Sequence, residues 1–190
     1  VKAMKGAVDI PISVKHRLGL DSMDAASSEK DYQFALDFIL AVADAGASQV
    51  TIHARNAVLK GLSPKENRSQ PPLRYEVAAR LRLDAQKQFP HLKVLLNGGL
   101  ENNEQIAGHW DDFDGFMVGR AAYHFPAMLL GWDDLIKTDG EAAGYLFSET
   151  EWHRIQIALV KQVQAWYDEC RLKDKPFYIG AFTRHILGLA

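Results

Sequence analysis

Four short apolar runs, rich in β-branched residues, constrain the fold of this chain more than any other feature. Each run ends in polar residues or glycine, and together they occupy residues 10–18, 48–55, 92–99 and 113–120. Amphipathic segments of helical periodicity separate them. Strands that alternate with helices at this spacing are typical of parallel βα units.

Two long segments and one short one carry the helical pattern, at residues 31–47, 72–90 and 102–110. The first segment is predicted to be a largely apolar helix that ends at Gly46. Its apolar face is expected to include Phe34, Leu36, Phe38, Ile39, Val42 and Ala43.

The polar residues of the strands point to a barrel rather than an open sheet. They stand at the C-terminal ends of all four runs, as Lys15 and Arg17, His53 and Arg55, Asn97 with Gly98 and Gly99, and Gly119 with Arg120. A (β/α)₈ barrel builds its active site at that face from several strand ends. A Rossmann sheet would carry a GxGxxG element after its first strand, and the sequence has none there.

After Pro126 the pattern becomes helical throughout. Residues 148–172 predict one long helix, and residues 177–189 predict the start of another. The predicted fold class is therefore α/β, with half of a TIM barrel in residues 1–135 and an all-α region in residues 140–190.

Composition narrows the class of protein. With 190 residues the chain suits one hydrophobic core, and its net charge of −2 argues against general coating of nucleic acid while allowing a local basic patch. The single cysteine, Cys170, fits a reducing compartment, and no apolar run approaches a membrane span, so a cytoplasmic location is expected. No spacing of His and Cys predicts a metal site.

The third and fourth runs suggest a phosphate site. Gly98 and Gly99 let backbone N–H groups approach an anion closely, and Gly119-Arg120 adds donors and a fixed positive charge. TIM barrels often bind phosphate with the loops after strands 7 and 8. Taken singly, each motif would more often be a turn or a capped strand end than a binding site, but the two motifs together, in this order, favour phosphate binding.

Lys15 and His53 are candidates for the same site. A lysine at a strand end can stabilise developing negative charge on a flavin or nucleotide, and a histidine can donate to a ring carbonyl or a phosphate. The alternative for each is a structural cap or an ion pair.

The loop after the second run is basic, with Arg55, Lys60, Lys65, Arg68 and Arg74. Such clusters bind phosphate backbones, and prolines on both sides make Lys65 and Arg68 the better candidates. A solvated loop without a partner remains the alternative, because Glu66 dilutes the charge.

These residues resemble a known family, the tRNA-dihydrouridine synthases, and the long loop resembles the A subfamily. The resemblance covers essentially the whole chain and is carried by VKHRLGLD, HARNAVLKGLSPKENR, PPLRY, LNGG and VGRAAYHFP. One departure is Val58, where the family usually has Trp.

The resemblance implies an FMN-containing TIM barrel followed by a helical tRNA-binding domain. NADPH would reduce the flavin, and a uridine of the tRNA D-loop would be reduced to 5,6-dihydrouridine. It assigns flavin contacts to Lys15 and His53, and the FMN phosphate to Asn97, Gly98, Gly99, Gly119 and Arg120. It assigns tRNA contacts to Lys65, Arg68 and Arg184.

The same resemblance makes the first run the fifth strand of the barrel, so that strands 5–8 are present. The proton-donating cysteine is then expected N-terminal to Val1. No catalytic residue is therefore expected in this chain, and we do not expect the chain to be active alone. Two alternatives stay open: a non-catalytic fragment that binds FMN and tRNA, and a different FMN-dependent TIM-barrel oxidoreductase.

Overall fold

The computed structural model describes residues 1–20, 29–141 and 149–176. The chain forms two compact units. One consists of Val1–Leu100 with Gly108–Gly119, and the other of Glu101–Ala107 with Arg120–Ala190. The first unit holds all strands of the described sheet, and the second is helical in its described part.

The first unit is built on a four-stranded parallel sheet in the order β1-β2-β3-β4. Its strands lie inside the four predicted runs, at Ser13–Arg17 (β1), Gln49–His53 (β2), Lys93–Asn97 (β3) and Gly115–Met117 (β4). Strands that neighbour in sequence also neighbour in space, so the winding never reverses as it does in a doubly wound sheet. The predicted α/β class is confirmed, and the topology is that of consecutive strands in a (β/α)₈ barrel.

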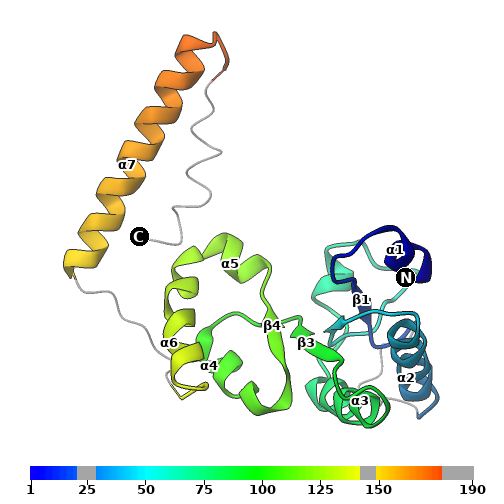
Figure 1. Cartoon of the computed structure of the whole chain (residues 1–190). Helices are drawn as coiled ribbons and strands as arrows, with labels where there is room; N and C mark the ends of the chain where they lie inside the picture. Colours follow the sequence, from blue (N-terminus) through cyan, green and yellow to red (C-terminus); the bar gives the residue numbers. More distant parts are fainter. Residues whose placement is uncertain (21–28, 142–148, 177–190) are drawn as a thin grey trace. The chain divides into compact units, whose positions relative to one another are not determined.

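Two long helices, α2 (Glu29–Asp44) and α3 (Tyr75–Gln88), lie side by side against this sheet (Figure 1). They meet strand side chains in one buried apolar cluster that includes Ile39, Leu81, Val50, Ile52, Val94 and Leu96. Each of these six is fully buried, and burying such a side chain contributes roughly 1.5–3 kcal/mol. This cluster is the core of the unit.

The buried face of α2 is only partly the one expected: Ile39 and Ala43 are buried as predicted, but the two phenylalanines are not. Phe34 and Phe38 are 57% and 39% exposed, whereas Ala35 is 2% exposed. The buried residues follow the helical repeat Tyr32, Ala35, Ile39 and Ala43. Small residues on this stripe let the helix backbone approach its neighbours closely, which leaves no room there for phenylalanine. The helix ends as predicted, with Gly46 at a φ of +98°.

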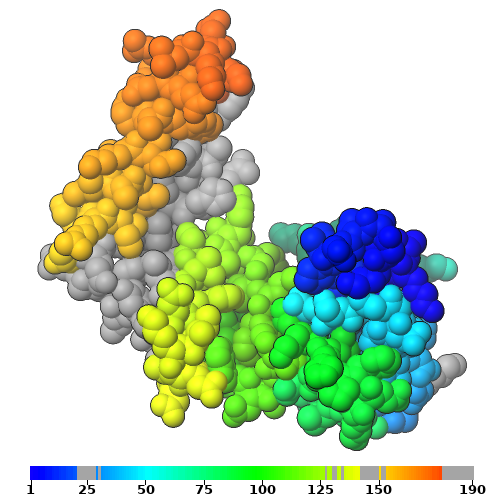
Figure 2. All heavy atoms as spheres, viewed as in Figure 1, coloured from blue at the N-terminus to red at the C-terminus, as the bar shows by residue number. Residues whose placement is uncertain are grey.

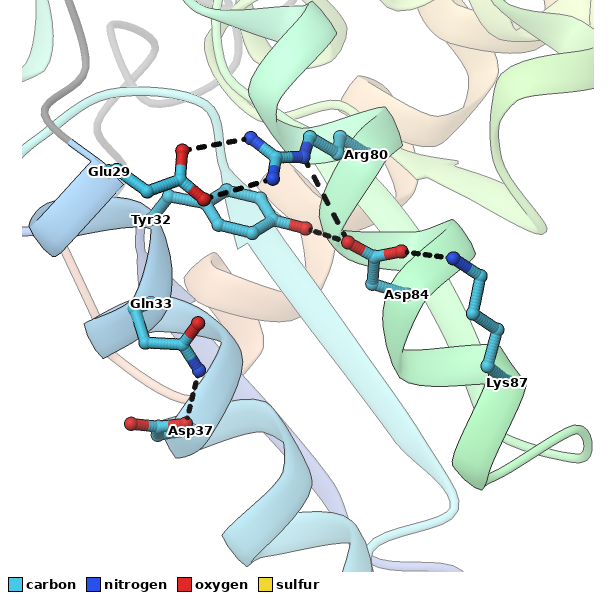
Figure 3. Close-up of polar contacts among 7 residues, drawn as sticks. All are labelled: Glu29, Tyr32, Gln33, Asp37, Arg80, Asp84 and Lys87. Atoms are coloured by element: carbon cyan, nitrogen blue, oxygen red, sulfur yellow. Dashed lines mark hydrogen bonds and ion pairs between the residues drawn. The ribbon is translucent and has the colours of Figure 1, made fainter.

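A polar clamp joins α2 to α3 on the outside of the core (Figure 3). The hydroxyl of the buried Tyr32 donates to the Asp84 carboxylate at 2.5 Å, and Lys87 donates to the other oxygen of Asp84 at 2.7 Å. Arg80 lies 3.8 Å over the Tyr32 ring and donates to both oxygens of Glu29. Burial, and then the hydrogen bond to Asp84, raises the pKa of Tyr32.

Helix α1 (Lys2–Ala7) lies against the end of α2. In the space-filling view its dark-blue atoms contact the lighter blue atoms of the first unit (Figure 2). Lys2 pairs with Asp44 at 3.7 Å, and the Lys5 side chain covers Gly46. Both lysines are on the surface, so this contact contributes little to stability.

The second unit contains short helices and one long one. They are α4 (Asn103–Ala107), α5 (Arg120–His124), η3 (Pro126–Gly131), α6 (Trp132–Lys137) and α7 (Glu149–Leu172). The buried Asn103 ties three of these together, because it donates to the Met128 carbonyl and accepts from the Trp132 indole. Helix α7 is the predicted long helix.

Two predictions about the C-terminal region stay untested. The helix predicted at residues 177–189 lies outside the described residues. The division into functional domains at residues 1–135 and 140–190 remains a prediction. No described helix is both long and apolar enough to cross a membrane.

Candidate functional site

The strand register gives the sheet one apolar face and one polar face. In parallel strands, residues in register point to the same side and successive residues alternate. One row contains Arg17, His53, Asn97 and Met117, and the row two residues earlier contains Lys15, Thr51 and Leu95. The intervening rows supply Val50, Ile52, Val94 and Leu96 to the core below α2 and α3. Three predicted site residues, Lys15, His53 and Asn97, therefore share the polar face.

Lys15 and Arg17 bring two positive charges together at the end of β1. Burial, and then repulsion from Arg17, lowers the pKa of Lys15. Burial, and then repulsion from Arg68, lowers the pKa of Arg17. None of the ion pairs among residues 1–20, 29–141 and 149–176 involves Lys15 or Arg17. The neighbouring cations Lys15 and Arg17, which pair with no carboxylate of the described residues, favour an anionic ligand.

A double-glycine turn follows β3 and is packed against His53. Gly98 and Gly99 have φ values of +103° and +69°, which favour glycine at both positions. A Cβ atom on Gly98 would lie 3.1 Å from Cε1 of the buried His53 ring, which is closer than an ordinary van der Waals contact. Successive N–H groups in such turns form concavities that bind anions.

Asn97 and Tyr75 fix the two ends of this turn. The Asn97 side chain donates to the Met117 carbonyl at 2.5 Å and so joins β3 to the end of β4. The Tyr75 hydroxyl, at the start of α3, donates to the Gly98 carbonyl at 2.7 Å. A Cβ atom on Gly99 would collide with Leu73 and would lie 2.8 Å from the Tyr75 hydroxyl oxygen.

The basic loop is attached to the sheet by Arg17. One guanidinium nitrogen of Arg17 donates to the Asn56 carbonyl at 2.8 Å and to the Asn67 carbonyl at 2.7 Å. Asn67 also closes the loop on itself, because its side-chain oxygen accepts from the Val58 N–H at 3.0 Å and its amide donates to the Val58 carbonyl. Polar contacts of this kind give a long loop a defined shape without a core.

Lys65 and Arg68 are presented by a short 3₁₀ helix in this loop, η1 (Glu66–Arg68), and both are exposed. Ser63 and Glu66 cap its start reciprocally: the Ser63 N–H donates to the Glu66 carboxylate at 2.8 Å, and the Glu66 N–H donates to the Ser63 hydroxyl at 3.3 Å. Glu66 therefore organises the loop.

A buried arginine anchors the C-terminal end of the same loop. Arg74 and Asn56 are each 2% exposed, and Arg74 donates to the Asn56 side-chain oxygen. The Arg74 N–H also donates to the Ala54 carbonyl at 2.9 Å. Sequence reasoning counted Arg74 among the basic loop residues without this anchoring role and missed Asn56, Asn67 and Tyr75. The signal for the two asparagines was the density of amide side chains after a buried strand, and no local signal indicated Tyr75.

The remaining predicted residues are placed as follows. Gly119 follows β4, and a Cβ atom there would meet nothing within 4 Å. Arg120 is the first residue of α5 and belongs to the second unit. Arg184 lies outside the described residues. Within the described residues, no group of three or more His, Cys, Asp or Glu side chains could hold a metal ion.

Comparisons with known proteins agree on one family. The family model described as dihydrouridine synthase (Dus) matches residues 1–169. A tRNA-dihydrouridine(20/20a) synthase of Vibrio parahaemolyticus is 40% identical over 190 residues, which are 100% of this chain and 52% of the relative. The relative of that name from Escherichia coli K12 is 38% identical over 190 residues, or 100% and 49%.

A third relative is closer over a shorter stretch. The tRNA-dihydrouridine(20/20a) synthase of Pseudomonas syringae pv. tomato is 50% identical over 129 residues, which are 68% of this chain and 35% of the relative. The chain thus spans about half the length of the two relatives that it matches throughout. The match to the family model extends over the whole sheet and most of the helical part. The chain belongs to the dihydrouridine synthase family.

Proposed function

We propose that this chain supplies the flavin-phosphate site and a tRNA-contacting loop of an FMN-dependent, NADPH-dependent tRNA-dihydrouridine synthase. The observation that carries the proposal is the pair of cations Lys15 and Arg17 at the end of β1, on the face of the sheet that also carries His53. The family of the chain supports the reaction class, and the relatives' names support tRNA as the substrate.

The residues present suit the phosphate of FMN. Gly98 and Gly99 form a turn with two positive φ values, and His53 packs directly on it. Backbone N–H groups of such a turn, with a nearby cation, are a common anion site. Asn97, Gly98 and Gly99, with Gly119 after β4, would hold the phosphate. When bound, FMN supplies hydride-transfer chemistry.

The residues of the polar face would orient the ring system. Lys15 lies two residues before the row that contains His53, on the same face of the sheet, so both side chains can contact one bound molecule. A lysine ammonium stabilises negative charge that develops on a ring during reduction. Partial burial is the main cause that lowers the pKa of Lys15. Desolvation strengthens its interaction with a bound anion.

The loop of η1 would contact the tRNA backbone. Lys65 and Arg68 are exposed at opposite ends of one 3₁₀ turn, and the ammonium of Lys65 makes no ion pair with any described residue. Lysine and arginine on a preorganised loop bind phosphates with little loss of side-chain and loop entropy. Arg184 would add a contact from the helical domain.

Binding assays on the purified chain test the proposal. FMN is titrated into the protein while flavin fluorescence is measured, and binding of unmodified tRNA transcripts is measured by filter retention. We expect Arg68→Ala to weaken tRNA binding about three- to tenfold and to leave FMN affinity unchanged, since each phosphate contact is modest and salt-dependent. We expect Lys15→Met to weaken FMN binding.

The matched control is Arg80→Ala. Arg80 is also an exposed arginine, but it pairs with Glu29 on the outer helices. Its loss should change neither affinity. If the chain takes up no FMN, or if Arg68→Ala lowers FMN affinity and spares tRNA binding, the assignment is wrong. Mass spectrometry of the tRNA nucleosides, after incubation with FMN and NADPH, tests the reaction itself.

A further inference from the structure

The segment that joins the basic loop to α3 also holds the double-glycine turn. Leu73 and Tyr75 come from this segment, and both lie against Gly99. The Tyr75 hydroxyl donates to the Gly98 carbonyl at 2.7 Å. The Tyr75 ring is itself held edge-on by His109, with ring centroids 4.7 Å apart. The hydroxyl therefore comes from a ring whose position is fixed by packing.

This hydrogen bond sets the orientation of the Gly98–Gly99 peptide. A trans peptide is planar, so its N–H points opposite to its carbonyl. With the Gly98 carbonyl held toward Tyr75, the Gly99 N–H points away from it. Among the described residues no backbone carbonyl accepts from this N–H, so it is available to a ligand.

Without an anchor, this peptide would rotate easily. Both flanking residues are glycine, which populates positive and negative φ almost equally. Rotation of the peptide plane would exchange the N–H for the carbonyl oxygen. A carbonyl oxygen repels a phosphate, whereas an N–H binds it.

We propose that Tyr75 is a positioning residue for the flavin phosphate, which holds the Gly99 N–H in its donating orientation. This inference rests on the proposed function, because it takes FMN as the ligand of the turn. It adds a residue of the helix layer to a site otherwise built from strand ends.

The test compares FMN with riboflavin, which has the same ring and side chain but no phosphate. Tyr75→Phe removes only the hydroxyl and keeps the ring. A hydrogen bond contributes about 0.5–1.5 kcal/mol, so we expect FMN affinity to fall about three- to tenfold. Riboflavin affinity should stay the same, so the preference for FMN over riboflavin falls by that factor.

Tyr32→Phe is the matched control. It also removes a tyrosine hydroxyl that donates a short hydrogen bond in the same unit, but on the outer clamp between α2 and α3. It should reduce thermal stability and leave the FMN-to-riboflavin preference unchanged. A general loss of stability would affect both variants and both flavins alike.

A measurement on the unmodified protein makes the test independent of how well the variant folds. Selective ¹⁵N-glycine labelling gives spectra with 14 glycine amides. We expect the Gly99 amide to shift downfield on addition of FMN and to stay in place on addition of riboflavin. Three results would overturn the inference. In the first two, Tyr75→Phe lowers the affinities for FMN and riboflavin equally, or lowers neither affinity. The third such result is a Gly99 amide signal that does not shift when FMN is added. A protein that binds neither flavin would instead overturn the proposed function together with the inference.

Discussion

Replacement of Arg17 by Met should release the basic loop from the sheet. The guanidinium links the end of β1 to Asn56 at the start of the loop and to Asn67 near its far end. The bonds from Arg17 to the Asn67 carbonyl, at 2.7 Å, and to the Asn67 side-chain oxygen, at 3.3 Å, tie the far part of the loop to β1. Hydrogen bonds to charged groups contribute about 1.5–3 kcal/mol.

The net change in loop-docking free energy is smaller than this value, because the lost hydrogen bonds are partly offset by a lost repulsion. Removing Arg17 also removes its repulsion with Arg68, which, after burial, lowers the pKa of Arg17 in the intact protein. The loop should therefore lose about 1–2 kcal/mol of docking free energy, which is a five- to thirtyfold increase in the open population. The core cluster does not include Arg17, so global stability should change less.

Limited trypsin digestion measures this population. The loop carries three exposed cleavage sites, Lys60, Lys65 and Arg68. When opening is fast, cleavage follows the open population, so these sites should be cut five to thirty times faster in Arg17→Met, by the free-energy change above. Arg80→Met is the control and should leave loop cleavage unchanged. Unchanged loop cleavage in a folded Arg17→Met protein would show that Arg17 does not hold the loop.

Two further predictions concern the turn and the polar face. Gly99→Ala should destabilise the protein by about 1–3 kcal/mol in thermal unfolding and should also reduce FMN binding. The reason is that the new Cβ atom would lie 2.8 Å from the Tyr75 hydroxyl oxygen, at a backbone φ of +69°. A melting temperature within one degree of that of the unchanged protein would contradict this prediction. The pKa of Lys15 in the folded protein is below its ordinary value, so the protonated form of Lys15 lowers the stability of the folded state. This loss of stability disappears as the pH rises from the lowered pKa toward the pKa of Lys15 in the unfolded chain. Lys15→Met should thus raise the melting temperature at pH 7. The difference in melting temperature between the variant and the unchanged protein should narrow toward pH 10. A difference that does not depend on pH would show that the charge of Lys15 is not its cause.

Much of the fold follows from local pattern. Apolar β-branched runs with polar C-terminal ends predicted each strand, because a strand buried on the helix side must be apolar along most of its length. Gly46 predicted the end of α2 because a positive φ excludes most other residues at that place. The motifs VKHR, HARN and LNGG also predicted that Lys15, His53 and Asn97 act together, since parallel strands place their C-terminal ends at one edge.

The contacts that shape the site depend on tertiary structure. The apolar pattern of α2 correctly indicated Ile39 and Ala43 for its buried face, but close packing selected Tyr32 and Ala35 in place of Phe34 and Phe38. No local pattern shows that Arg17 reaches Asn67, 50 residues later, or that Tyr75 reaches Gly98, 23 residues later. The sequence by itself determines strands, helix ends and the types of residue at the site. Which loop is tied to which strand, and which hydroxyl orients the glycine turn, is decided by packing between distant segments, because hydrogen bonds between them form only once the core has brought them within 3 Å.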